Sequence, residues 1–85
     1  MTPPLLTAQP ARIHRRAVPP TPVEAHVRQA ERHRAALAAH EPVVVEVAGH
    51  GRGWYVEHVC ADGTYRLWRD GAALVAAWTD VPLGQ

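Results

Sequence analysis

The sequence predicts an α+β domain in which one α-helix packs on a four-stranded antiparallel β-meander. A capped segment with helical spacing begins at residue 21, the apolar spacing changes to every second residue after Pro42, and two Asp-Gly pairs separate strand-like runs. We expect a disordered tail over residues 1–20, a single domain over residues 21–79 and a frayed C-terminus over residues 80–85.

The first 20 residues carry five prolines and few large apolar side chains. Such a segment buries too little surface to offset the entropy of ordering it, which predicts disorder. The start MTPPLLTAQPARIHRR places prolines before the basic residues instead of an apolar stretch after them, unlike a signal peptide. No run in the chain approaches the roughly 20 apolar residues of a membrane span. Cys60 is the only cysteine, which favours a reducing compartment. We therefore expect a cytoplasmic protein that does not associate with membranes.

Composition limits what the charges can indicate. All nine Lys and Arg residues are Arg, and Lys, Ser, Asn and Phe are absent, a bias typical of a GC-rich bacterial genome. The formal net charge is only +1. Residues 1–41 carry six Arg and three Glu, whereas residues 42–85 carry three Arg and five acidic residues. The front half is thus mildly basic and the back half mildly acidic.

The helix is expected to begin at a capping box. Thr21 suits the N-cap, Pro22 suits the first helical position, and Glu24 can complete the box. The helix can run to about His40, because the residue before Pro42 is disfavoured in the helical region. Arg34 falls within the apolar stripe and is expected to reach solvent or an acidic partner. That stripe comprises Val23, Val27, Ala30, Leu37 and Ala38.

Strands are expected from Pro42 to the glycine-rich loop at residues 49–53, and then at about residues 54–60, 64–69 and 73–78. Two-residue turns at Asp62-Gly63 and Asp70-Gly71 would place Cys60 opposite Tyr65, His58 opposite Leu67, Leu67 opposite Leu74 and Tyr65 opposite Ala76. A four-residue loop at residues 49–52 would place Val45 opposite Val56 and Val47 opposite Trp54. The predicted core face comprises Val43, Val45, Val47, Trp54, Val56, His58, Cys60, Tyr65, Leu67, Leu74, Ala76 and Trp78.

Three of the six histidines, His26, His33 and His40, recur every seven residues. Seven residues advance a helix by about 10.5 Å, too far for two of them to bind one ion. We interpret them as a solvated row or an interface edge, with a metal shared between two copies of the helix as the alternative. No cofactor or metal site is expected.

His58 and Cys60 are spaced as a nucleophilic dyad on one face of a strand would be. No third group is placed to orient the histidine, so both are interpreted as core residues. The loop GHGRG lacks the spacing of a phosphate-binding motif and leads into a strand, which favours a hairpin tip. We therefore expect no enzymatic activity.

The second face of the sheet has no helix to cover it, although it carries aromatic and apolar residues. Exposed surfaces of this kind often bind partners, and Trp, Tyr and Arg are enriched at binding hot spots. The leading hypothesis is a non-enzymatic protein-interaction module that binds a protein partner or a second copy. An ordinary solvent face, in which Glu57 and Arg66 screen the rings, is the structural alternative. The candidate partner-binding residues are Tyr55, Val59, Arg66, Trp68 and Val75.

Nucleic-acid binding is the second functional hypothesis, because the tail and helix are rich in arginine. It ranks second since the sheet half is slightly acidic and no helix-turn-helix, zinc-finger or RNA-binding motif is present. The candidate phosphate-contacting residues are Arg12, Arg15, Arg16, Arg28 and Arg32.

Overall fold

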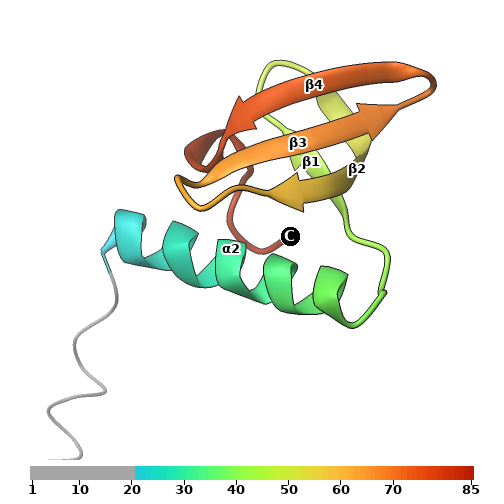
Figure 1. The fold of residues 1–85 in the computed structure, drawn as a ribbon. Helices are drawn as coiled ribbons and strands as arrows, with labels where there is room; N and C mark the ends of the chain where they lie inside the picture. The colour runs from blue at the N-terminus through green and yellow to red at the C-terminus, as the bar shows by residue number, and fades with distance from the viewer. Residues whose placement is uncertain (1–20) are drawn as a thin grey trace, which may run out of the picture.

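A computed structural model describes residues 21–85 of the chain, so the expected tail over residues 1–20 lies outside the described residues. One helix packs against one face of a four-stranded antiparallel sheet with the strand order β1-β2-β3-β4, which confirms the predicted fold class (Figure 1). The elements are α2 (Pro22–Ala38), β1 (Val44–Val47), β2 (Gly51–Val59), β3 (Thr64–Arg69), β4 (Ala72–Ala77) and the 3-10 helix η1 (Trp78–Asp80).

Both ends of α2 are capped by local hydrogen bonds. The Glu24 N–H donates to the Thr21 hydroxyl over 3.1 Å, and the Thr21 N–H donates to the Glu24 carboxylate over 3.0 Å, which completes the predicted capping box. At the other end His40 has a φ of 61°, and the Glu41 N–H donates to the Ala36 carbonyl over 2.9 Å. This left-handed residue closes a Schellman motif and turns the chain toward the sheet.

The β3–β4 hairpin has the predicted register. Leu67 lies opposite Leu74, Tyr65 lies opposite Ala76, and Arg69 pairs with Ala72 across the turn. The two turn residues, Asp70 and Gly71, have φ values of 49° and 82°. Positive φ at both positions is the signature of a type I′ turn, whose twist matches that of the strands it joins.

The β2–β3 hairpin differs from the prediction, because its loop has three residues. The Gly63 N–H donates to the Cys60 carbonyl and the Cys60 N–H donates to the Thr64 carbonyl, so only Gly63, with a φ of 89°, is left-handed. A type I turn followed by one left-handed residue shifts the pairing by one position, which reverses the face of each side chain next to the turn.

A bulge between Val56 and His58 compensates for this one-residue shift, so the residues of β2 before the bulge keep their predicted faces and those after it are reversed. Val59 therefore points into the core, where it is 2% exposed, whereas His58, expected in the core, is exposed. Cys60 is half-buried. The predicted side-chain directions are thus wrong over the last three residues before the turn and correct from Trp54 to Val56.

The β1–β2 hairpin closes around a turn at residues 48–50, instead of the expected four-residue loop at 49–52, with the His50 N–H donating to the Val47 carbonyl over 2.9 Å. Val45 therefore lies opposite Trp54 and not Val56. Because the shift at Val45 is two residues, Val45 and Trp54 stay on their predicted face, and a bulge between Val45 and Val47 then places Val47 opposite Gly51.

The core lies between α2 and the covered face of the sheet. The helix contributes one buried apolar side chain, Ala30, and the buried polar residues Gln29 and His33. Ala36 and Leu37 of the helix are partly buried against the core, while Val23 is 57% exposed. The buried face of α2 is therefore more polar than the predicted stripe. The buried apolar residues are Ala30, Val43, Val45, Val47, Trp54, Val56, Val59, Tyr65, Leu67, Ala76 and Val81.

Polar residues on the helix are buried because residues 81–85 pass between α2 and the sheet (Figure 1). The Gln29 amide donates to the Val81 and Pro82 carbonyls over 3.3 and 3.0 Å. Its oxygen accepts from the N–H groups of Gly84 and Gln85 over 2.8 and 3.2 Å. Val81 itself is fully buried. These contacts join residues 81–85, within the expected frayed C-terminus, to α2, while Leu83, Gly84 and Gln85 are themselves exposed.

Arg34, expected to reach solvent or an acid, contacts backbone carbonyls. Its guanidinium donates to the Val59 carbonyl over 3.2 Å and to the Cys60 carbonyl over 2.6 Å. These carbonyls lie where β2 leaves the sheet and enters its turn. The helix thus holds the end of β2 through a charge-assisted contact.

His33 lies in the core, which corrects the interpretation of a solvated histidine row. Its Nδ1 lies 2.5 Å from the Tyr65 hydroxyl, and its Nε2 lies 3.4 Å from the Gln85 carbonyl oxygen. A carbonyl only accepts, so Nε2 carries the proton of the neutral ring and Nδ1 accepts from Tyr65. Burial raises the pKa of Tyr65 to about 12, which keeps its hydroxyl protonated as this donor.

Stability is expected to decrease as the pH falls below about 6.5, because burial lowers the pKa of His33 from its ordinary value of 6.5. The positive charge of Arg32 lowers it further, and the hydrogen bond to Gln85 opposes the shift. The unfolded chain then takes up the proton first, so the His33 contribution is complete above the unfolded pKa and is lost on acidification.

Chemical unfolding at a series of pH values measures this dependence. His33→Asn should reduce the slope between pH 7 and pH 5, roughly the range in which histidine titrates. His50→Asn, at an exposed loop residue, should keep the wild-type slope. Equal slopes for wild type and His33→Asn would show that His33 does not couple protonation to folding.

Candidate functional site: the uncovered face of the sheet

The pairing of the strands aligns one row of side chains across the face opposite α2. Val44 lies opposite Tyr55, Tyr55 opposite Trp68, and Trp68 opposite Ala73. We call these four residues, one from each strand, the aromatic row. Directly opposite residues in antiparallel strands have Cβ atoms about 4.5–5.5 Å apart, so the row forms a contiguous surface.

The side chains of the aromatic row are open to solvent. The exposed fractions are 48% for Val44, 51% for Tyr55 and 47% for Trp68. The rings of Tyr55 and Trp68 have centroids 6.5 Å apart and are inclined at 49°, so one side of each ring packs against the other ring. Their remaining surfaces face outward from the centre of the sheet.

Beside this row lie basic and apolar groups. On β3, Arg66 lies opposite His58 of β2 and opposite Val75 of β4. Val75 is 66% exposed. The face therefore presents two aromatic rings flanked by a guanidinium and an imidazole, with Glu57 exposed at the bulge of β2.

Four of the five candidate partner-binding residues, Tyr55, Arg66, Trp68 and Val75, lie on this face. The fifth, Val59, lies in the core for the reason given above. Ala73 and His58 join the face and were not among the candidates. Ala73 could have been found from the Asp70-Gly71 turn, which sets its position opposite Trp68. His58 is exposed because the loop after β2 has three residues and a bulge separates His58 from Val56.

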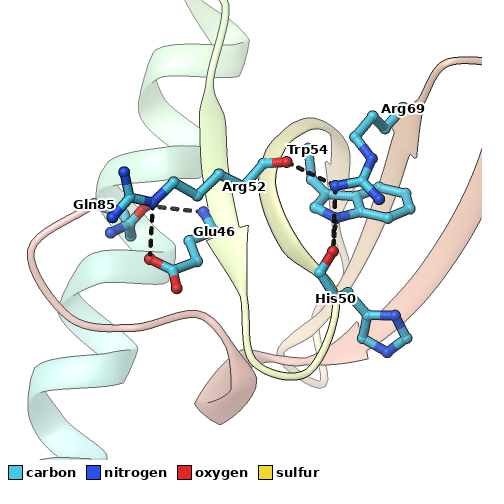
Figure 2. A network of polar contacts seen from close by, with 6 residues as sticks. All are labelled: Glu46, His50, Arg52, Trp54, Arg69 and Gln85. Carbon is cyan, nitrogen blue, oxygen red and sulfur yellow. Dashed lines mark hydrogen bonds and ion pairs between the residues drawn. The ribbon is translucent and has the colours of Figure 1, made fainter.

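The glycine-rich β1–β2 loop is held by Arg69 (Figure 2). Arg69 Nη1 donates to the His50 and Arg52 carbonyls over 3.2 and 2.8 Å, and its guanidinium carbon lies 4.2 Å from the centre of the Trp54 ring. Trp54 Nε1 also donates to the His50 carbonyl, over 3.2 Å. These contacts engage the loop carbonyls within the fold, which agrees with a structural hairpin tip.

The remaining sequence candidates are dispersed. Arg28 and Arg32 are exposed on α2, on the opposite side of the sheet from the aromatic row. Arg12, Arg15 and Arg16 lie outside the described residues. His58 and Cys60 differ in environment, since one is exposed and the other half-buried at the start of a turn.

Two further findings concern residues 21–85. No group of three or more His, Cys, Asp or Glu side chains in this range could hold a metal ion. No helix in the same range is long and apolar enough to cross a membrane.

Comparison of the chain with protein-family models, with curated proteins and with solved structures finds no match.

Proposed function

We propose that this protein is a small non-enzymatic interaction module that binds a protein partner through the aromatic row. The observation that supports the proposal is the exposure of Tyr55 and Trp68 at the centre of a face that no element of residues 21–85 covers. Exposed apolar surface rimmed by charged groups is typical of protein contact sites.

The chemistry of the face indicates the kind of partner. Trp and Tyr are rigid side chains that bind with little loss of conformational entropy, and their desolvation dominates the affinity of many interfaces. Arg66 and His58 flank the rings on one side and favour an acidic group on the partner. A partner with an apolar centre and an acidic rim would match both features.

The proposal predicts that Trp68→Ala weakens binding at least about 30-fold, the effect of removing a hot spot worth about 2 kcal/mol. A protein recovered from the native host with the full chain is purified and titrated against wild type and variants by calorimetry. Val23→Ala is the control, because Val23 is a comparably exposed apolar residue on α2. It should change the affinity less than about twofold, the usual effect of surface changes outside an interface.

The same titrations distinguish nucleic-acid binding. Duplex DNA and single-stranded RNA of mixed sequence are titrated at increasing salt against wild type, Trp68→Ala, and the double variant of Arg28→Ala with Arg32→Ala. Tight, salt-sensitive binding that survives Trp68→Ala and is lost in the arginine variant would refute the proposal, because phosphate contacts and not the aromatic row would carry the affinity.

A further inference from the structure

The two edge strands of the sheet, β1 and β4, differ in the hydrogen bonding of their outer backbone groups. At the β1 edge, the Glu46 N–H donates to the Gln85 side chain over 2.9 Å, and just beyond the strand the Ala48 N–H donates to the Asp80 carbonyl over 2.8 Å. Glu46 and Arg52 add a charged pair with a separation of 3.9 Å at this edge (Figure 2). The chain thus covers the edge of β1 with its own later residues.

The β4 edge has no such protection from the part of the chain that the structure describes. Within residues 21–85, the backbone of β4 makes hydrogen bonds only with β3, and it forms the outer side of the sheet in Figure 1. Its six residues, AALVAA, include no charge and no proline, and its pairing with β3 contains no bulge. Charge, proline and bulges are the usual devices that prevent a free edge from pairing with another strand.

The turn before β4 fixes which backbone groups face outward. Arg69 and Ala72 close a two-residue turn, so this pair exchanges hydrogen bonds, and bonded pairs then alternate along the strand. Leu74 and Ala76 consequently bond to β3. The free N–H and C=O groups belong to Ala73, Val75 and Ala77.

We propose that a second copy of the chain pairs antiparallel with β4, with Val75 opposite Val75 of the second copy on a two-fold axis. Ala73 then lies opposite Ala77 of the second copy, and the outward backbone groups of both strands pair with one another. This register joins residues of the same sheet face, so both helices lie on one side of a continuous eight-stranded sheet and both aromatic rows lie on the other.

The charges and side-chain sizes at the edge fit a second copy. On the face that carries Val75, its neighbours along β4 are Ala73 and Ala77, which place no bulky or charged group at the junction of the two strands. Arg66 is the nearest basic residue on this face, one strand inward. The two Arg66 positions would be separated by three strand spacings, about 14 Å, which exceeds the screening length of about 8 Å at physiological salt.

The joined sheet also changes the area available for binding. One aromatic row comprises only four residues, two of them half-exposed rings, whereas a standard interface buries about 800 Å² on each partner. Two rows on one continuous face bring the combined surface closer to that size. Pairing of one six-residue strand buries less than a standard interface, so the dimer is expected to form reversibly at high concentration.

Sedimentation equilibrium of the full chain over a range of concentrations tests the pairing. Wild type should shift from monomer to dimer, and Val75→Lys should remain monomeric, because two lysines would face each other at the axis. Val44→Lys is the matched control, since it places the same charge on the same face but at the β1 edge, and it should dimerise like wild type. Circular dichroism of each variant checks that the fold is retained.

Crosslinking tests the register independently. In a Cys60→Ala background, Val75→Cys should form a disulfide-linked dimer under mild oxidation much faster than Val44→Cys, since residues on the axis have Cα atoms about 5.5 Å apart. A wild type that stays monomeric, an equal loss of dimer in Val44→Lys, or equal crosslinking at the two positions would overturn the proposal. Because these measurements involve only this chain, they are separate from the test of the protein partner.

Discussion

Replacing Leu67 with alanine is expected to lower the free energy of unfolding by about 2 to 5 kcal/mol. Leu67 is 1% exposed and lies between Val56 of β2 and Leu74 of β4 in the register of the sheet. Removing its side chain leaves a cavity at the centre of the covered face. Small domains are stable by only about 5–15 kcal/mol, so this loss is a large fraction of the total.

Urea unfolding followed by tryptophan fluorescence measures the change. Leu83→Ala is a matched control, because it removes the same atoms from a leucine that is 48% exposed, and it should cost less than about 0.5 kcal/mol. Leu74→Ala should lie between the two, since Leu74 is half-buried. Similar losses for Leu67→Ala and Leu83→Ala would contradict the packing of β3 against the core.

Replacing Gln29 with methionine is expected to lower the free energy of unfolding by about 2 to 4 kcal/mol, because a buried polar group that loses its partner costs roughly 1–3 kcal/mol. Methionine keeps the length of the side chain but makes none of the four hydrogen bonds to residues 81–85. The segment is expected to leave its place between the helix and the sheet, which would also expose Val81.

Hydrogen exchange distinguishes this local loss from a general weakening of the helix. The N–H groups of Gly84 and Gln85 donate to Gln29 and should exchange faster in Gln29→Met, in a larger proportion than those of β3. Glu31→Met places the same residue at an exposed position of α2 and should leave both stability and exchange near wild type. Unchanged exchange at Gly84 and Gln85 would show that Gln29 does not hold the segment.

Gln29 and His33 place two polar side chains in the interior of a small domain. Both are buried on α2, and both contact residues 81–85. A domain of this length has a small apolar core, and a buried polar network stabilises it only when every member is paired. The returning segment supplies those pairs, and it also satisfies Glu46 at the β1 edge. One short stretch of chain therefore completes the core and covers one edge of the sheet, while no other described residue pairs with the outer edge of β4.

The candidate site could be predicted in part. The exposure of Tyr55, Trp68 and Val75 follows from the alternation of their strands and from the Asp70-Gly71 turn, and these are local properties of the sequence. The face of Val59 depends on whether the Asp62-Gly63 turn has two or three residues. That choice is not determined by the dipeptide alone, because Asp-Gly is compatible with both kinds of turn.

By itself the sequence determined the helix start at Thr21, the change to strand spacing after Pro42 and the pairing of β3 with β4, because capping, side-chain alternation and a two-residue turn act within a few residues. Only the tertiary structure decided which side of the helix is buried. Gln29 and His33 are interior because residues more than 50 positions away return to pair with them, and a helical stripe of valine and alanine contains no sign of that return. The spacing of apolar and polar residues indicates which side chains favour burial or solvent. The burial of a polar group depends instead on hydrogen-bond partners that only the folded chain brings near.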